Sequence, residues 1–253
     1  MTRGRSLSVA GGLLGFALGG FFDGILLHQI LQWHHLLSLV DGVETLAGQV
    51  LADGLLHAAM VLVALAGLLA LFRARGRLSE PDSGRRLVGA ALIGFGAWHW
   101  TDTILSHWLL GLHRIRIDSP DPLAWDLLWF ALFGVGPVLA GCALRRGRRG
   151  AQGGGGREAA GVLAVAVALA GAWAMRPPPG EQTSLALFAP GVEDGRAVNV
   201  IMQAGGAVLW RSGAVWAVRW KGPARPGRLI RGGALPIGGG VFGPGCLGWS
   251  RRS

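Results

Sequence analysis

Four ionisable side chains interrupt an apolar stretch near the N-terminus. Asp23, His28, His34 and His35 lie within residues 16–35, a run otherwise hydrophobic enough for a membrane. An isolated acid at bilayer depth costs roughly 2.5–3.5 kcal/mol even on insertion-based scales, so Asp23 and His28 must face the interior of a helix bundle and meet partners there. Imidazoles and carboxylates gathered in such a place are ligands that transition metals use.

The same pattern returns about 79 positions later in another apolar segment. The two series are Asp23, His28 and His34, and then Asp102, His107 and His113. Two polar triads at one spacing indicate a helix pair that is repeated once. A pseudo-twofold axis would bring the two polar faces together, because each half alone would leave its acid and its imidazoles unpaired in lipid.

All seven histidines belong to the first three predicted helices or their ends: His28, His34, His35, His57, His99, His107 and His113. At about 100° per residue, Asp23 shares a helix face with His34, and His28 shares a neighbouring face with His35. A carboxylate beside an imidazole orients the ring and raises its basicity. Without a nearby cysteine, such ligation suits copper, iron or zinc and argues against magnesium or calcium.

We therefore predict a metal site on the outer side of the bundle, with His28 and His107 as a symmetric pair of ligands. Asp23 and Asp102 would ligate the metal or orient its ligands. The remaining candidate ligands are His34, His57, His99 and His113. No nucleophile, phosphate-binding loop or general acid pair stands out, so catalytic residues stay unknown and any enzymatic activity would depend on the metal.

Two other functions remain open. The first is electron transfer by a haem b clamped between His28 and His107, since membrane four-helix bundles can hold a porphyrin with one imidazole from each side. The second is a proton or ion pathway through the Asp and His cluster. For Asp53 and Asp126, at the outer starts of two helices, N-terminal capping is the simpler interpretation.

Composition places the chain among multi-pass membrane proteins. Its 253 residues are 51% hydrophobic and only 15% charged, and the mean hydropathy is +0.44. The net charge of +10 does not indicate a nucleic-acid partner. The Arg residues instead gather in the short connections between apolar runs, as the positive-inside rule requires. Cys142 and Cys246 would lie on opposite sides of the membrane and form no disulfide.

The expected fold is an all-α membrane protein: a four-helix bundle from a duplicated helix pair, a fifth transmembrane helix, and a small C-terminal α+β domain. The helices are expected at about 8–31, 50–72, 87–112, 123–144 and 159–175. The domains would be a duplicated four-helix transmembrane domain (1–145), a basic Gly-rich cytoplasmic linker (146–158), the fifth helix (159–175) and an extracytoplasmic domain (182–253).

The count of Lys and Arg in the connections predicts an N-terminus inside and a C-terminus outside. The fifth helix, apolar and without charges, would lie outside the repeated bundle. In the C-terminal domain, alternation and turn residues predict a strand at 184–190, a helix at 194–204, a hairpin of 207–210 with 214–220, and a last strand at 240–249.

The segment LGFALGGFFDGILLHQILQWHH, residues 14–35, resembles the signature of a bacterial multi-pass membrane family known only as a domain of unknown function, number 2243. Asp102-Thr-Ile-Leu-Ser-His107 resembles that family's second signature, and the resemblance covers about residues 8–145. It implies the cytoplasmic (inner) membrane as location and no settled activity. In setting, the family's members resemble proteins found beside assembly factors of haem-copper oxidases. The resemblance thus favours copper, with a respiratory oxidase or its assembly factors as partners besides the lipid bilayer; a homodimer stays open.

Overall fold

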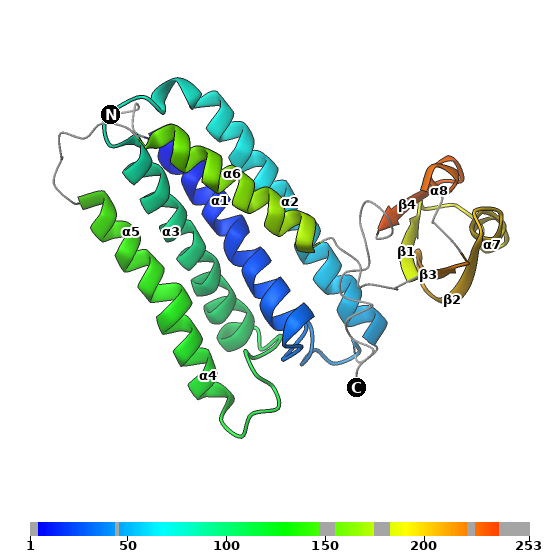
Figure 1. Cartoon of the computed structure of the whole chain (residues 1–253). Coiled ribbons are helices and arrows are strands. Elements are labelled where there is room, and N and C mark those ends of the chain that lie inside the picture. Colours follow the sequence, from blue (N-terminus) through cyan, green and yellow to red (C-terminus); the bar gives the residue numbers. More distant parts are fainter. Residues whose placement is uncertain (1–4, 44–45, 147–154, 175–182, 222–225, 238–253) are drawn as a thin grey trace. The chain divides into compact units, whose positions relative to one another are not determined.

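The computed structural model describes residues 5–43, 46–146, 155–174, 183–221 and 226–237 (Figure 1). The chain divides into two compact units, Met1–Ala172 and Trp173–Ser253. The first unit is helical and the second combines a sheet with helices. The chain is thus an all-α membrane protein with a small C-terminal α+β domain, as predicted.

Four long helical segments form the bundle. They are α1 (Arg5–Asp23) continued by η1 (Gly24–Ile30), α2 (Leu46–Arg73), α3 (Ser83–Thr101) continued by η3 (Asp102–Leu109), and α4 (Pro122–Trp129) continued by η4 (Phe130–Val135) and α5 (Gly136–Arg146). The continuations η1, η3 and η4 are π-helical, while η2 (Arg75–Arg77) is a single 3-10 turn after α2. Sequence periodicity predicted uninterrupted α-helices here, so the π-helical segments are a correction.

The helices α1 and α3 lie side by side at the centre of the bundle, and α3 also packs on α5 (Figure 1). Their contact is close because glycines face backbone. A Cβ at Gly15 would overlap the carbonyl oxygen of Ala91, and one at Gly94 would overlap that of Gly12. These two contacts are equivalent under the spacing of about 79 residues between the polar triads. The absence of side chains lets the two backbones approach closely, as small residues do in membrane helix pairs.

Among the described residues, four helices are long and apolar enough to cross a membrane: Ser6–Ile30, Ala52–Arg73, Pro122–Arg146 and Gly156–Ala174. The last is α6 (Gly156–Ala174), whose Ala160 and Val167 are buried and whose Gly171 lies against Phe21 of α1. The fifth helix therefore packs on the bundle rather than apart from it. The segment α3–η3 is not among the four, but it runs along α1 and so shares its depth.

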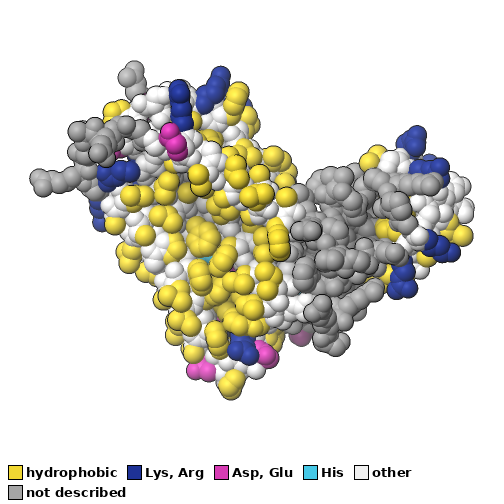
Figure 2. Space-filling view, viewed as in Figure 1, with side chains coloured by type: hydrophobic (Ala, Val, Ile, Leu, Met, Phe, Trp, Pro, Cys, Tyr) yellow, Lys and Arg dark blue, Asp and Glu magenta, His cyan; other side chains and the backbone are white. Residues whose placement is uncertain are grey.

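The outer surfaces of the helices are hydrophobic. Leu62, Leu65 and Leu69 of α2 and Leu132 and Leu139 of the α4–α5 segment are each about half exposed or more. Figure 2 shows such side chains spread over the sides of the bundle, with Lys and Arg gathered at the end where α1 and α3 begin. Exposed leucines between charged ends are expected of a surface that meets lipid.

The C-terminal unit is a four-stranded antiparallel sheet in the order β2-β3-β1-β4 with two helices. Its elements are β1 (Thr183–Phe188), α7 (Asp194–Gln203), β2 (Gly206–Ser212), β3 (Val215–Trp220), α8 (Pro226–Arg231) and β4 (Ala234–Ile237). Phe188, Ile201, Trp216, Trp220 and Leu229 are buried in its core. The predicted first strand, helix and hairpin are confirmed, whereas α8 and β4 were not predicted. The strand predicted at 240–249 lies outside the described residues.

Candidate metal centre

Both polar series begin where an α-helix changes into a π-helix. Asp23 is the last residue of α1, and His28 lies in η1; Asp102 and His107 both lie in η3. In an α-helix, residues five apart point about 140° away from each other. In a π-helix, hydrogen bonds join residues five apart, so the acid and the imidazole come onto one face. This local winding is why Asp23 joins His28, although α-helical spacing put them on different faces.

The two π-helices η1 and η3 end in the same turn. Gln32 and Gly111 both have left-handed backbones, with φ of 53° and 63°. The turn is closed by equivalent hydrogen bonds in the two halves: Leu31 N to Leu26 O (2.8 Å), Trp33 N to Leu27 O (3.0 Å), Leu110 N to Leu105 O (2.9 Å) and Leu112 N to Ser106 O (2.7 Å). His34 and His113 therefore follow the helices as loop residues, and the turn folds each of them back beside its own π-helix.

The first triad consists of Asp23, His28 and His34, all buried. One ligand atom from each lies within 4.8 Å of the others. The Nε2 atoms of His28 and His34 are 3.1 Å apart. Asp23 Oδ1 is buried without a hydrogen-bond partner in the described part of the chain. The triad thus brings two imidazole nitrogens and an unsatisfied carboxylate oxygen together in a dry place.

The second triad consists of Asp102, His107 and His113, also buried and within the same 4.8 Å limit. Here the carboxylate lies between the rings: Asp102 Oδ2 is 3.0 Å from His107 Nε2, and Asp102 Oδ1 is 3.5 Å from His113 Nε2. The residue types match those of the first triad, but the acid already pairs with its imidazoles.

Two backbone carbonyls set the tautomers of the loop histidines. His34 Nδ1 donates to Ile115 O at 2.9 Å, and His113 Nδ1 donates to Leu36 O at 3.0 Å. A carbonyl can only accept, so Nδ1 carries the proton and the Nε2 lone pair of each neutral ring faces its triad. Burial, with His113 and His28 nearby, holds the pKa of His34 well below its usual range. His34 is therefore a neutral ring, the form that binds metals.

Asp53 and Asp126 orient the other two histidines. Asp53 Oδ1 is 3.1 Å from His28 Nδ1, and Asp126 Oδ1 is 3.0 Å from His107 Nδ1. The same oxygens accept the backbone N–H groups of Leu36 (2.8 Å) and Ile115 (3.0 Å). These carboxylates are not helix caps, since α2 begins upstream at Leu46 and Asp121 caps α4 by accepting from Ala124 N. The shared opening Asp-x-Leu at both positions, Asp53-Gly-Leu and Asp126-Leu-Leu, was the sequence signal that could have identified them.

The two triads adjoin each other. The rings of His34 and His113 are stacked, with centroids 4.4 Å apart and planes 14° apart. His34 also lies 6.3 Å from His107, and His113 lies 6.5 Å from His28, between ring centroids. The six predicted ligands of the two series therefore form one cluster.

His57 and His99 lie beside this cluster but in neither triad. His57 packs against Gly24, where a Cβ would overlap its Nε2. His99 Nδ1 accepts from Trp129 Nε1 at 3.1 Å, with Phe22, Phe95 and Phe133 around its ring. The Nε2 atoms of both histidines are buried and make no hydrogen bond within the described residues. Of the eight predicted ligands, the structure thus brings six together and leaves these two apart.

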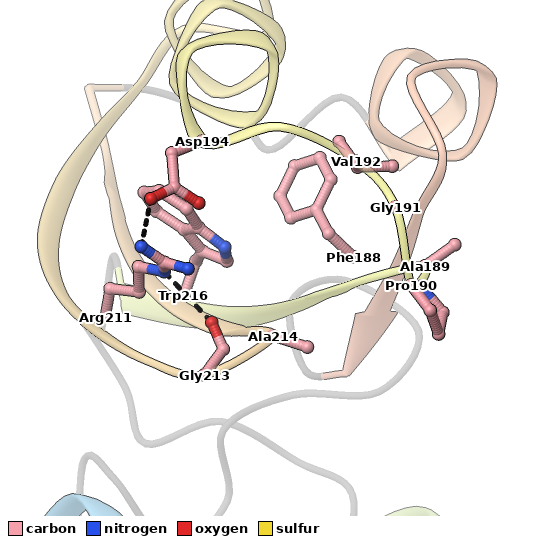
Figure 3. A pocket seen from close by; sticks show the side chains of 10 residues that line it. All are labelled: Phe188, Ala189, Pro190, Gly191, Val192, Asp194, Arg211, Gly213, Ala214 and Trp216. Carbon is pink, nitrogen blue, oxygen red and sulfur yellow. Dashed lines mark hydrogen bonds and ion pairs between the residues drawn. The ribbon is translucent and has the colours of Figure 1, made fainter.

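The C-terminal unit has a shallow pocket beneath the start of α7 (Figure 3). Arg211 is its cation, but the guanidinium pairs with Asp194, donates to Gly213 O and lies 5.1 Å from the centroid of the Trp216 ring. These partners already satisfy Arg211, and the pocket holds no histidine. The pocket therefore adds nothing to the metal centre.

Comparison with known families gives one match. A family model described as a predicted membrane protein, DUF2243, matches residues 10–148. This range contains both triads, Asp53 and Asp126. Neither the curated proteins nor the solved structures include a significant match.

Proposed function

The chain belongs to the DUF2243 family of predicted membrane proteins, and from this premise we propose that it binds a transition metal within the membrane through its two triads. The observation that carries the proposal is the orientation of four buried imidazoles. At Nδ1, His34 and His113 are hydrogen-bonded to carbonyls and His107 to the carboxylate of Asp126, while His28 Nδ1 lies 3.1 Å from the carboxylate of Asp53. All four Nε2 atoms are left for the triads, which is how metal-binding histidines are commonly held.

The spacing of the ligand atoms supports this function. Two ligands in adjacent positions, each about 2.0–2.1 Å from a metal, are about 2.9–3.4 Å apart at angles between 90° and 109°. His28 Nε2 and His34 Nε2 are 3.1 Å apart, and His107 Nε2 and Asp102 Oδ2 are 3.0 Å apart. Two imidazole nitrogens at such a distance repel each other through their lone pairs unless a proton or a metal ion lies between them.

Copper is the metal we propose. The ligands are nitrogen and oxygen atoms, and among divalent ions of the first transition row copper binds such sets most strongly. Iron is the second candidate, because two histidines and one carboxylate in each triad equal the ligand set of non-haem iron oxygenases. Zinc is compatible with the same ligands.

The site suits exchange or redox chemistry better than a purely structural role. Structural metal sites are usually closed by four protein ligands, while functional sites keep a position open. Each triad offers three ligands. The metal would serve the assembly of a respiratory oxidase or redox chemistry at the outer side of a bacterial cytoplasmic membrane, with the N-terminus inside and the C-terminus outside. The basic end of the bundle, with Arg85, Arg86 and Arg145, supports this orientation.

A haem fits the cluster less well. A porphyrin clamped by His28 and His107 would need a flat space between the two rings, but His34 lies against both of them.

An ion pathway also fits less well. Before Asp23, the buried hydrophobic side chains of α1 are those of Leu7, Ala10, Leu14, Ala17 and Phe21. These apolar side chains offer no relay for a proton along α1.

Metal analysis of the purified protein tests the proposal. The wild-type chain in detergent should hold stoichiometric copper, iron or zinc after loading, and the double variant His28→Ala/His107→Ala should hold less than a tenth as much. His99→Gln is the matched control, because it changes a buried histidine outside both triads and keeps an acceptor for Trp129. Absence of bound metal in the wild type, or equal metal in the double variant, would refute a metal function. A Soret band would support haem, and pH-dependent flux in liposomes without metal would support the ion pathway.

A further inference from the structure

We propose that the two triads hold two metal ions side by side, as one dinuclear centre; this inference rests on the proposed function. One ion would take Asp23, His28 and His34 as ligands. The other would take Asp102, His107 and His113.

Each triad is a complete set within its own half. The closest ligand contacts stay inside a triad: His28 with His34 at 3.1 Å in the first, and Asp102 with His107 at 3.0 Å in the second. A single ion shared by all six ligands would also need ligand contacts of this length between the two halves. The geometry thus points to two coordination positions and not to one.

The two positions are neighbours because nothing separates the rings that border them. His34 belongs to the first triad and His113 to the second, and their rings stack at 4.4 Å. Their Nδ1 protons go to carbonyls of opposite halves, at Ile115 and Leu36. This crossed pair of hydrogen bonds joins the loop histidine of each half to the backbone of the other half.

Charge gives an independent argument. Four carboxylates lie at the cluster, Asp23, Asp53, Asp102 and Asp126, and all are nearly fully buried. The guanidinium that pairs with them is that of Arg114, 2.7 Å from Asp126. With neutral imidazoles, one divalent ion would leave the buried cluster anionic. Two divalent ions with a bridging hydroxide would bring it to neutrality, and buried charge is costly unless it is balanced.

The experiment compares two single variants with the wild type, all as full chains in detergent loaded with Cu²⁺. His28→Ala alters only the first triad, and His107→Ala alters only the second. We expect two copper ions per wild-type chain and one in each variant by metal analysis. Electron paramagnetic resonance should show a magnetically coupled pair with a half-field transition in the wild type, and an isolated Cu²⁺ signal in each variant.

A second pair of variants distinguishes the loss of a metal ligand from misfolding. Asp23→Asn and Asp102→Asn keep the size of each side chain and should give the same loss of one ion and of the coupling. The dinuclear proposal is overturned by a wild type with one ion per chain, by two uncoupled ions, or by single variants that lose both ions. One ion per chain would leave the proposed metal function standing, whereas no ion at all would refute both.

Discussion

The two halves of the bundle build the same framework around different charges. In both, a π-helix, a left-handed turn and a crossed hydrogen bond present Nε2 atoms to a triad. The difference lies at the Oδ2 atoms of Asp53 and Asp126, the supporting carboxylates beside His28 and His107. His35 Nδ1 meets Asp53 Oδ2 at 2.7 Å, while Arg114 meets Asp126 Oδ2 at 2.7 Å. The geometry that orients the ligands is therefore shared, but the second partner of the supporting carboxylate is an imidazole in one half and a guanidinium in the other.

A second difference concerns the space beside each π-helix. In the first half, Gly24 makes room for His57. In the second half, the corresponding positions are Thr103, whose hydroxyl is buried, and Phe130. The first site thus has an additional imidazole close by, and the second site has none there. Similar triads can therefore differ in affinity, and the following variants test how far the halves are equivalent.

The largest difference should come from the supporting carboxylates. Asp126→Ala leaves Arg114 without its acid, removes one of the two acids beside His107, and should lower the free energy of unfolding by about 3–5 kcal/mol. Asp53→Ala leaves no permanently charged group without its acid and should lower the free energy of unfolding by about 1–3 kcal/mol. Unfolding in detergent, followed by circular dichroism, measures both. Asp118→Ala is the control, since this exposed acid pairs with Arg116 at the surface. Equal losses for the two buried acids would show that Arg114 carries no special weight.

Substitutions in the contact between α1 and α3 should lower the free energy of unfolding by similar amounts at its two equivalent positions. Gly15→Ala and Gly94→Ala each place a methyl group on a backbone carbonyl of the other helix and should cost about 1–3 kcal/mol by overpacking. Gly12→Ala meets nothing within 4 Å and serves as the matched control, with a gain of up to about 1 kcal/mol from helix propensity. Thermal unfolding distinguishes them. A tolerated Ala at one of the two packed positions would contradict the pseudo-symmetric packing of α1 and α3.

Metal affinity should fall when a supporting carboxylate loses its charge. Asp53→Asn and Asp126→Asn keep the shape but weaken the hold on His28 and His107, and each should reduce affinity at its own triad about 10- to 100-fold. Competition with a chelator measures the loss. Glu158→Gln, in the first turn of α6, is the control and should leave affinity unchanged. An unchanged affinity in both carboxylate variants would mean that these acids only stabilise the fold.

The smallest effect should come from the left-handed turns, and it should differ between the two halves. Gly111→Ala puts a Cβ on a residue at φ 63° and should cost about 1 kcal/mol. Gln32→Gly relieves the same conformation at φ 53° and should cost less than Gly111→Ala or stabilise the fold. Chemical unfolding compares the two. A loss for Gln32→Gly as large as that for Gly111→Ala would indicate that contacts of the Gln32 side chain outweigh its backbone strain.

The sequence by itself was sufficient for the membrane class, for the positions of the long helices and for most of the C-terminal elements. Apolar runs of sufficient length and basic connections report on the solvent around a segment, which is a local property. The recurrence of Asp, His and His at one spacing likewise identified the six side chains that the structure gathers at one place. Their identity as ligands remains our proposal.

Tertiary structure decided how those six side chains meet. The winding of η1 and η3 is set by a difference of one residue in hydrogen bonding, which hydrophobic periodicity does not reveal. The roles of Asp53 and Asp126, and the carbonyls of Leu36 and Ile115 that orient the loop histidines, depend on contacts between segments distant in the chain. A sequence shows which polar groups must be satisfied in an apolar medium, but only the packing of the helical segments and of the loops between them determines which partner satisfies each group.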